Sequence, residues 1–215
     1  MFKLFLAAIG IFTIITIAEL IWRGKKHGPE FIRKFIHATV GSFVAFWPWF
    51  LSWEQIELSA IVFVLAITAT SLVKPLGQIF TVASSPDKLD RSSAGEFFFT
   101  LGFAVAAFGT HNKYIFMAAL LHLSVADTLA AVIGKRYGRR NRYSILGLEK
   151  SFAGSLAFLI CSIIIVSIYC ALAHADWSIL FWLPLLITAL ENVGVYGSDN
   201  LSIPLSVTLL LRLAA

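Results

Sequence analysis

The stretch ALLHLSVADTLAAVIGKRYGRR, residues 119–140, decides the fold class. It is apolar enough to lie in lipid, yet it carries His122 and Asp127 well before its basic end. A membrane-spanning helix needs about 20 mainly apolar residues, and a charged side chain at its centre costs about 2.5–3.5 kcal/mol. On a helix, Asp127 shares one face with Gly134 and Gly138. The stretch therefore predicts a transmembrane helix with a carboxylate and a small-residue face near its basic end.

The composition of the whole chain is also that of a membrane protein. The chain has 215 residues, 59% of them hydrophobic, and a mean hydropathy of +0.84, whereas soluble domains are about 45–50% apolar. Its two cysteines, Cys161 and Cys170, lie roughly 13 Å apart along one predicted helix, which is too far for a disulfide. The net charge of +5 is gathered in loops, so we expect no nucleic-acid partner.

Continuous apolar runs predict an all-α integral membrane protein, a polytopic bundle of about seven transmembrane helices. The predicted spans are residues 2–22, 35–53, 56–73, 95–110, 114–134, 152–173 and 177–191. The run 203–215 is either a short eighth span or a re-entrant segment. The first run lacks a small-residue cleavage site and its cations follow it, so we interpret it as a retained anchor. Residues 1–215 form one predicted domain, in which 1–32 are the anchor span and its basic loop.

The basic residues predict how the bundle is oriented. Of the 17 Lys and Arg residues, 14 fall in loops on one predicted side. The positive-inside rule places these loops in the cytoplasm and the N-terminus outside. The unusual polar segments lie on the same side as these loops; besides the basic end of residues 119–140 they are RKFIH (33–37), DRSSAGE (90–96), LEKSFAGS (148–155) and ENVGVYGSDNLSIP (191–204). We therefore expect a multi-pass protein whose functional loops face the cytoplasm.

Two segments have the character of a phosphate site. Lys150, Ser151 and Gly154 open the predicted sixth span, where free N–H groups and the positive helix end suit a phosphate. The alternative is a snorkelling lysine and a serine cap. The small face of residues 127–138 would let phosphates approach the helix, and Lys135 belongs to a basic loop that attracts an anionic nucleotide. The alternative for the glycines is close helix packing.

The acidic residues on this side predict a site for a divalent metal. Hard oxygen ligands suit Mg²⁺, and the candidates are Asp127, Glu96, Glu191 and Asp199, with Asn200 beside them. For residues 199–204 the alternative is an Asx turn followed by a helix that begins with proline.

Arg33 and His37 lie four residues apart and share a helix face at the cytoplasmic end of the second predicted span. Arg33 can fork onto a phosphate, and His37 can donate a hydrogen bond or carry a proton. The alternatives are a positive-inside anchor and a histidine satisfied at a helix interface. His122, nearer the membrane centre, is predicted to form a hydrogen bond between helices.

The segments RKFIH, Asp127–Gly134–Gly138, KSFAGS and DNLSIP resemble, in order and approximate spacing, the polyprenol kinase family. This family comprises dolichol, phytol and farnesol kinases and the CTP-dependent diacylglycerol kinase of fungi, and the resemblance covers residues 33–205. It implies an enzyme that moves the γ-phosphoryl group of CTP to an isoprenoid alcohol or diacylglycerol with a divalent metal, taken as Mg²⁺. It implies a nucleotide role for the residues of the two phosphate-like segments, and it equates Asp199 and Asn200 with the family's late DN motif.

Two other functions remain open from the sequence. A cytidylyltransferase of the phosphatidate type also uses CTP in a membrane, but it would release pyrophosphate and a CDP-lipid. A proton-coupled transporter would use Asp127 and His122 as a proton relay. The polar segments lie at span ends beside apolar helices. If the chain is a kinase, we therefore expect its lipid substrate to enter sideways from the bilayer.

Overall fold

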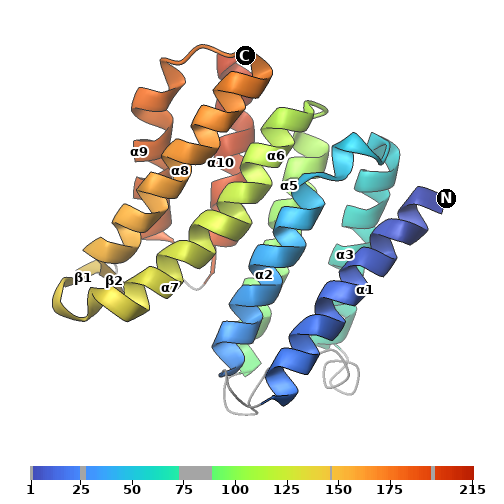
Figure 1. The fold of residues 1–215 in the computed structure, drawn as a ribbon, viewed down its shortest axis with the longest axis horizontal. Helices are drawn as coiled ribbons and strands as arrows, with labels where there is room; N and C mark the ends of the chain where they lie inside the picture. The colour runs from blue at the N-terminus through green and yellow to red at the C-terminus, as the bar shows by residue number, and fades with distance from the viewer. Residues whose placement is uncertain (1, 25–27, 73–88, 146, 195–196) are drawn as a thin grey trace.

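The structure is a computed structural model, which describes residues 2–24, 28–72, 89–145, 147–194 and 197–215. Nearly all of these residues are helical (Figure 1). The helices are α1 (Phe2–Arg23), α2 (Pro29–Ala45), α3 (Trp53–Leu72), α5 (Leu89–Gly109), α6 (Lys113–Leu121), α7 (Asp127–Tyr137), α8 (Phe152–Ala173), α9 (Ile179–Val193) and α10 (Asp199–Ala214). The short elements are the 3₁₀ turns η1 (Trp47–Trp49) and η4 (Gly138–Arg140), the π-helical turn η3 (His122–Ala126), and the strands β1 (Arg142–Ile145) and β2 (Leu148–Ser151).

Three helical segments among the described residues are long and apolar enough to cross a membrane. They are Phe2–Arg23, Phe152–Ala173 and the rod Lys113–Arg140, in which α6, η3, α7 and η4 follow one another without a break. Gly95–Gly109 and α9 are shorter apolar helices. The helical class is thus confirmed, while the count of seven spans and the external N-terminus stay predictions.

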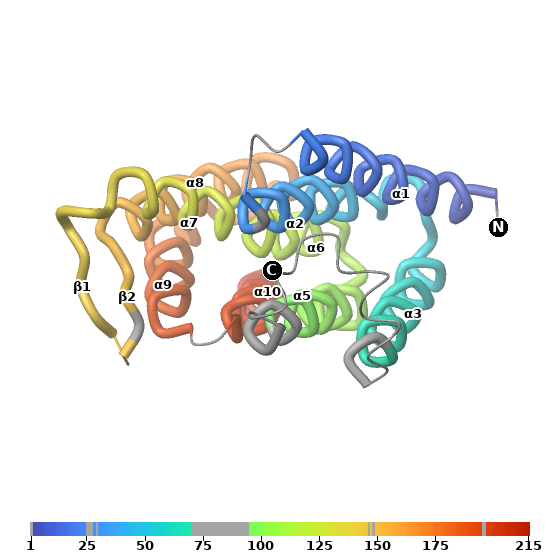
Figure 2. The backbone as a smooth tube through the Cα atoms, turned by 90° about the horizontal axis from the view of Figure 1, so that it is seen from below, coloured from blue at the N-terminus to red at the C-terminus, as the bar shows by residue number. Residues whose placement is uncertain are grey.

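The helices form two rows, which are seen end-on in Figure 2. One row holds α1, α2, α7 and α8, the other holds α3, α5, α10 and α9, and α6 lies between them. Large side chains fill the space between the rows, among them the fully buried Trp47, Phe116, Phe158 and Tyr169. One end of the bundle carries the start of α2, the end of α7 and the β1–β2 hairpin (Figure 1). We call it the site end.

The second predicted span, 35–53, has other bounds than the helix that the structure shows there. Helix α2 begins at Pro29, six residues before the predicted start at 35, because proline is well suited to the first turn of a helix. It ends at Ala45, and the turn η1 around Pro48 follows. The apolar run continues through this turn without a break, so hydropathy alone extended the span to residue 53.

The β1–β2 hairpin is a feature that the all-α prediction missed. Arg142 pairs with Ser151 and Ile145 with Leu148 in an antiparallel ladder. Gly147, in the tight connection, has a φ of 78°, which glycine adopts without steric cost. Lys150 and Ser151 therefore lie on a strand, and α8 begins only at Phe152.

Helices α5 and α10 cross closely because α5 carries glycines at seven-residue intervals. A Cβ atom on Gly102 would lie 2.1 Å from the carbonyl oxygen of Asn200. A Cβ on Gly109 would lie 2.8 Å from Cγ2 of Thr208. At the site end, Gly95 approaches Gly197, whose φ is 84°. This crossing fixes the first turn of α10, with Asp199 and Asn200, against α5.

Candidate active site

Five charged side chains from five parts of the chain gather at the site end. They are Lys34 of α2, Asp127 of α7, Lys150 of β2, Glu191 of α9 and Asp199 of α10. We call them the charged cluster. The sequence predicted four of these residues as site residues, and the structure brings those four together with Lys34.

Lys34 and Asp127 form an ion pair between α2 and α7. The Lys34 Nζ atom lies 2.5 Å from Asp127 Oδ2, and each side chain is 14% exposed. The hydroxyl of Thr128 also reaches the carbonyl oxygen of Lys34, at 3.5 Å. A partly buried carboxylate needs a nearby cation, so Lys34 explains how Asp127 is tolerated beside an apolar helix.

Lys150 and Glu191 form the second ion pair. The Lys150 ammonium donates to the Glu191 carboxylate at 2.6 Å and to the Glu191 backbone carbonyl at 2.8 Å. Lys150 is 18% and Glu191 8% exposed. The charges of Asp127 and Asp199 also act on Glu191, so the two ion pairs belong to one electrostatic unit.

Asp199 completes the charged cluster at the start of α10. Burial raises the pKa of its carboxyl above the ordinary value, and the negative charge of Asp127 adds to the rise, while Lys150 and Lys34 oppose it. Its Oδ1 accepts a hydrogen bond from the backbone N–H of Asn200 at 3.0 Å. The side-chain amide of Asn200 donates to the carbonyl of Gly95 at 3.1 Å. Asn200 thus holds α10 to α5, and its predicted contact with the nucleotide stays a prediction.

The small-residue face of α7 packs against the start of α8. A Cβ on Gly138 would lie 2.4 Å from Ser151 Oγ, and one on Gly134 would lie 3.0 Å from the same atom. Ser151 Oγ accepts the N–H of Gly154 at 3.1 Å and so caps α8. The packing and cap alternatives therefore account for these residues, and a further role of Gly134, Gly138, Ser151 and Gly154 with a nucleotide stays a prediction.

Three further predicted residues, Arg33, His37 and Glu96, lie at the α2–α5 side of the charged cluster. The charges of Lys34 and Asp127 act on His37, whose ring meets Phe99 edge-on at 4.2 Å between centroids. The charge of Arg33 acts on Glu96. Arg33 and Lys34 are neighbours in the sequence but point apart, Arg33 toward α5 and Lys34 toward α7.

Lys135, predicted to attract the nucleotide, is paired with Glu30 across the α2–α7 boundary. Both side chains are at least half exposed, at 64% and 50%. Solvent-exposed pairs contribute little to stability, so the Lys135 ammonium is free to exchange this partner for an anion.

The hairpin is fastened to α9 beside the second ion pair. Asn192 Oδ1 accepts hydrogen bonds from the Tyr143 hydroxyl at 2.6 Å and the Ser155 hydroxyl at 2.7 Å. Tyr143 is directly opposite Lys150 in the hairpin, and Asn192 follows Glu191 in α9. This network therefore fixes the position of Lys150. Sequence reasoning had no signal for this network, because its three residues are polar types that are common in any loop.

The carboxylates of the charged cluster have the donor type that Mg²⁺ prefers. Asp127, Glu191 and Asp199 are three acids against two lysines, so the cluster favours an added cation. Within the described residues, no three His, Cys, Asp or Glu side chains already converge into a metal site, and Asp127 and Glu191 are each paired with a lysine. A metal that arrives with a nucleotide would compete for these oxygens, and magnesium binding stays a prediction.

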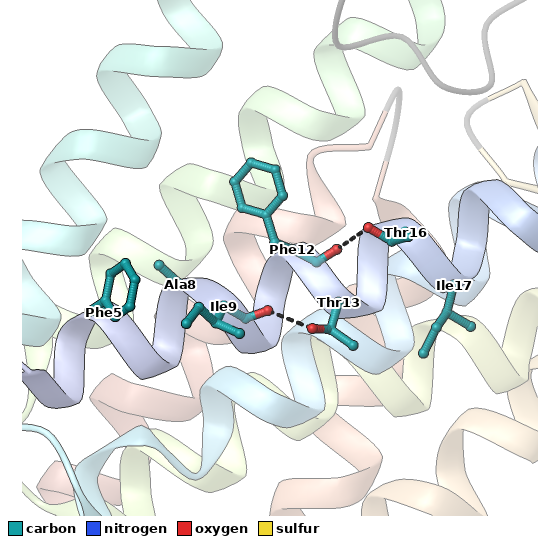
Figure 3. A pocket seen from close by; sticks show the side chains of 7 residues that line it. All are labelled: Phe5, Ala8, Ile9, Phe12, Thr13, Thr16 and Ile17. Atoms are coloured by element: carbon teal, nitrogen blue, oxygen red, sulfur yellow. Dashed lines mark hydrogen bonds between the residues drawn. The ribbon is translucent and has the colours of Figure 1, made fainter.

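Two features away from the cluster have structural explanations. His122 is buried and its ring nitrogens contact Ala118 O and Ser162 Oγ, each at 2.8 Å, which confirms the predicted hydrogen bond between helices. A shallow hollow lies on α1, lined by Phe5, Ala8, Ile9, Phe12, Thr13, Thr16 and Ile17 (Figure 3). Its two hydroxyls donate to carbonyls of their own helix, so this face suits contact with lipid.

Comparison with known proteins finds a relative along almost the whole chain. The chain is 28% identical to the phytol kinase of Synechocystis sp. over 212 residues, which are 95% of this chain and 88% of that protein. No protein-family model and no solved structure matches the chain. The similarity confirms the resemblance that the short motifs carry, and it supports a kinase that acts on a lipid alcohol.

Proposed function

We propose that the chain is a lipid-alcohol kinase that transfers the γ-phosphoryl group of CTP to an isoprenoid alcohol of the phytol type. The observation that carries the proposal is the similarity to a phytol kinase along almost the whole chain. The charged cluster supports it, since lysines and carboxylates at one end of an apolar bundle suit a polar nucleotide and a lipid hydroxyl that meet at the membrane surface.

The cluster suits phosphoryl transfer, which depends mainly on positioning and charge stabilisation. Lys34, Lys150 and Arg33 would bind the phosphates. The lipid hydroxyl oxygen attacks the γ-phosphorus, the bond from that phosphorus to the bridging oxygen breaks, and CDP leaves. The hydroxyl proton passes to a base, for which His37 and the cluster carboxylates are the candidates.

Mg²⁺ is the proposed cofactor, and it would neutralise charge on the phosphates when bound. Asp127, Glu191 and Asp199 would hold it, and Glu96 is a further candidate. The lysines that now pair with Asp127 and Glu191 would then be released toward the phosphates.

The proposal is tested with purified protein in detergent or nanodiscs, incubated with γ-labelled CTP or ATP, Mg²⁺, and phytol, farnesol, a longer polyprenol or diacylglycerol. The expected products are a labelled lipid monophosphate and CDP. Release of pyrophosphate with a CDP-lipid would identify a cytidylyltransferase instead. Transport driven by a proton gradient, without nucleotide turnover, would identify a transporter.

Sideways entry of the substrate is tested in the same assay. Long-chain alcohols should be phosphorylated more efficiently than short water-soluble ones, because their tails can remain in lipid while the hydroxyl reaches the cluster. Equal kcat/KM for short and long alcohols would contradict this route.

A further inference from the structure

The π-helical turn His122–Ala126 ends at Asp127. The backbone N–H of Asp127 donates to the carbonyl of His122, five residues earlier, and to that of Ser124, three residues earlier. A regular α-helix closes its hydrogen bonds over four residues, and single π turns inside helices occur frequently at functional sites. The direction of Asp127 is therefore set by a turn that begins at His122.

The ring of His122 is held by a polar contact at each of its two nitrogens. Its Nδ1 lies 2.8 Å from the carbonyl oxygen of Ala118, and its Nε2 lies 2.8 Å from the hydroxyl of Ser162 on α8. A carbonyl can only accept, so Nδ1 carries the hydrogen and Nε2 accepts from Ser162. His122 and Ser162 are both fully buried, so loss of either partner leaves a polar group unsatisfied.

The other side of the turn is held by α2. A Cβ on Gly41 would lie 2.4 Å from the Cβ of Ser124, so the backbone of α2 lies directly against the turn. The Ser124 hydroxyl donates to the carbonyl of Leu120 at 2.7 Å and remains within its own helix. The turn thus packs between α8, which follows Lys150, and α2, which carries Lys34.

We propose that His122 is a positioning residue, which acts through the π-helical turn to hold the Asp127 carboxylate against Lys34 and beside the proposed nucleotide site. The connection runs from Ser162 to the His122 ring, from the His122 carbonyl to the Asp127 N–H, and from the Asp127 carboxylate to Lys34. The effect on catalysis rests on the proposed function, but the effect on the backbone of Asp127 does not.

The test compares Ser162→Ala with Ser167→Ala. Both serines lie on α8, but the Ser167 hydroxyl donates to the carbonyl of Ile163 in its own helix, so its loss should leave the turn intact. In Ser162→Ala we expect amide hydrogen exchange at Asp127 to become at least roughly 10-fold faster, which is about 1.4 kcal/mol. We also expect kcat to fall by a similar factor. The Mg²⁺ concentration that gives the half-maximal rate should rise.

Equal exchange at Asp127 in the two variants would overturn the inference. A Ser162→Ala protein that is less stable, but has unchanged turnover per folded molecule and unchanged Mg²⁺ dependence, would also overturn it by making His122 a packing residue only. If the wild-type protein phosphorylates no lipid alcohol, the proposed function fails, and the exchange comparison still decides whether His122 holds Asp127.

Discussion

Asp127 lies within the apolar rod Lys113–Arg140 and Lys34 lies in the first half of α2, and each is tolerated there because of the other. Their side chains are equally exposed, at 14%. An isolated charge in such a place is costly, whereas a hydrogen-bonded pair offsets much of that cost. A pair held this way is also a pair that a metal and a phosphate can separate, since each partner gains a new counter-charge.

We predict that Asp127→Asn lowers turnover per folded molecule by at least roughly 100-fold, or about 2.7 kcal/mol. The amide keeps an acceptor for Lys34 but removes the charge that would hold the metal. The measurement is the initial rate against Mg²⁺ concentration. The control is Asp176→Asn, an exposed acid on the loop between α8 and α9. A folded variant with wild-type turnover and Mg²⁺ dependence would remove Asp127 from the site.

Lys34→Gln should raise the KM for the nucleotide by at least about 10-fold, because an ammonium near the phosphates is lost, which is about 1.4 kcal/mol. Steady-state kinetics with varied nucleotide measure the change. Lys113→Gln is the matched control, since Lys113 lies over the rings of Trp49 and Tyr114 away from the cluster. Unchanged nucleotide KM in Lys34→Gln would mean that this lysine only neutralises Asp127.

At the scale of single residues, sequence reasoning found Asp127, Lys150, Glu191 and Asp199 because polar residues at the ends of apolar runs are conspicuous. It missed Lys34 because it predicted a site on the helix face that Arg33 and His37 share. It interpreted Lys34 as a positive-inside anchor. A signal was available, since a carboxylate in an apolar helix requires a cation. The sequence does not show which of two adjacent cations supplies it, because that depends on how α2 is rotated.

The crossing of α5 and α10 determines where the first turn of α10 lies. We predict that Gly102→Ala reduces activity at least roughly 10-fold, although Gly102 itself lies outside the charged cluster. A new Cβ would meet the backbone of Asn200 at 2.1 Å, and backbone cannot rotate aside as a side-chain end can. Asp199 would be displaced with it.

The control for Gly102→Ala is Gly28→Ala, because nothing lies within 4 Å of the added Cβ there. Gly109→Ala should have an intermediate effect, since its new Cβ would meet only a methyl group of Thr208, at 2.8 Å. Activity per folded molecule and melting temperature in detergent should be highest in Gly28→Ala, lower in Gly109→Ala and lowest in Gly102→Ala. Equal values for all three would contradict the close crossing.

The hairpin network makes a separate prediction for Tyr143→Phe. The change removes one hydroxyl, which contacts Asn192 and Ser155, and it keeps the ring beside Phe152. One such hydrogen bond is worth about 1 kcal/mol, so the nucleotide KM should rise about 5-fold as Lys150 becomes less firmly placed. Tyr114→Phe, far from the hairpin, is the control. An effect on kcat alone would contradict a role in holding Lys150.

At the scale of elements, most helices could be predicted because an apolar run and a helix of similar length coincide, as they do for α1 and α8. The second span could not, because the run continues through the turn at Pro48. The hairpin could not because its strands are four residues each. Such short strands show little alternation, and they are held by pairing with each other and by bonds to α9.

At the scale of the whole molecule, the site end and the opposite end are predicted to face opposite sides of the membrane. Cysteines placed at Arg139 or Glu149, exposed near the hairpin, should react with an impermeant thiol reagent only from the cytoplasmic side of sealed vesicles. Cysteines at His111 or Asp176 should react only from the outside. The native cysteines are free and buried and are replaced by alanine in the parent protein. The opposite labelling pattern would invert the proposed topology.

At this scale, the charge distribution was the most informative feature of the sequence. It predicted that the polar segments share one end of the bundle, and the start of α2, the end of α7 and the hairpin do lie at one end (Figure 1). The arrangement of the helices in two rows could not be predicted, because it depends on pairs such as Gly102 and Asn200 that are 98 residues apart in the sequence.

The crossing of α5 and α10 has a consequence for biosynthesis. Helix α5 is translated about a hundred residues before its partner, so its glycine face must wait in the membrane until α10 leaves the ribosome. Until then Asp199 is absent from the charged cluster, and the nascent chain has no complete site. Helix α10 thus completes the charged cluster during assembly: a nascent chain that stops before residue 199 should have no kinase activity.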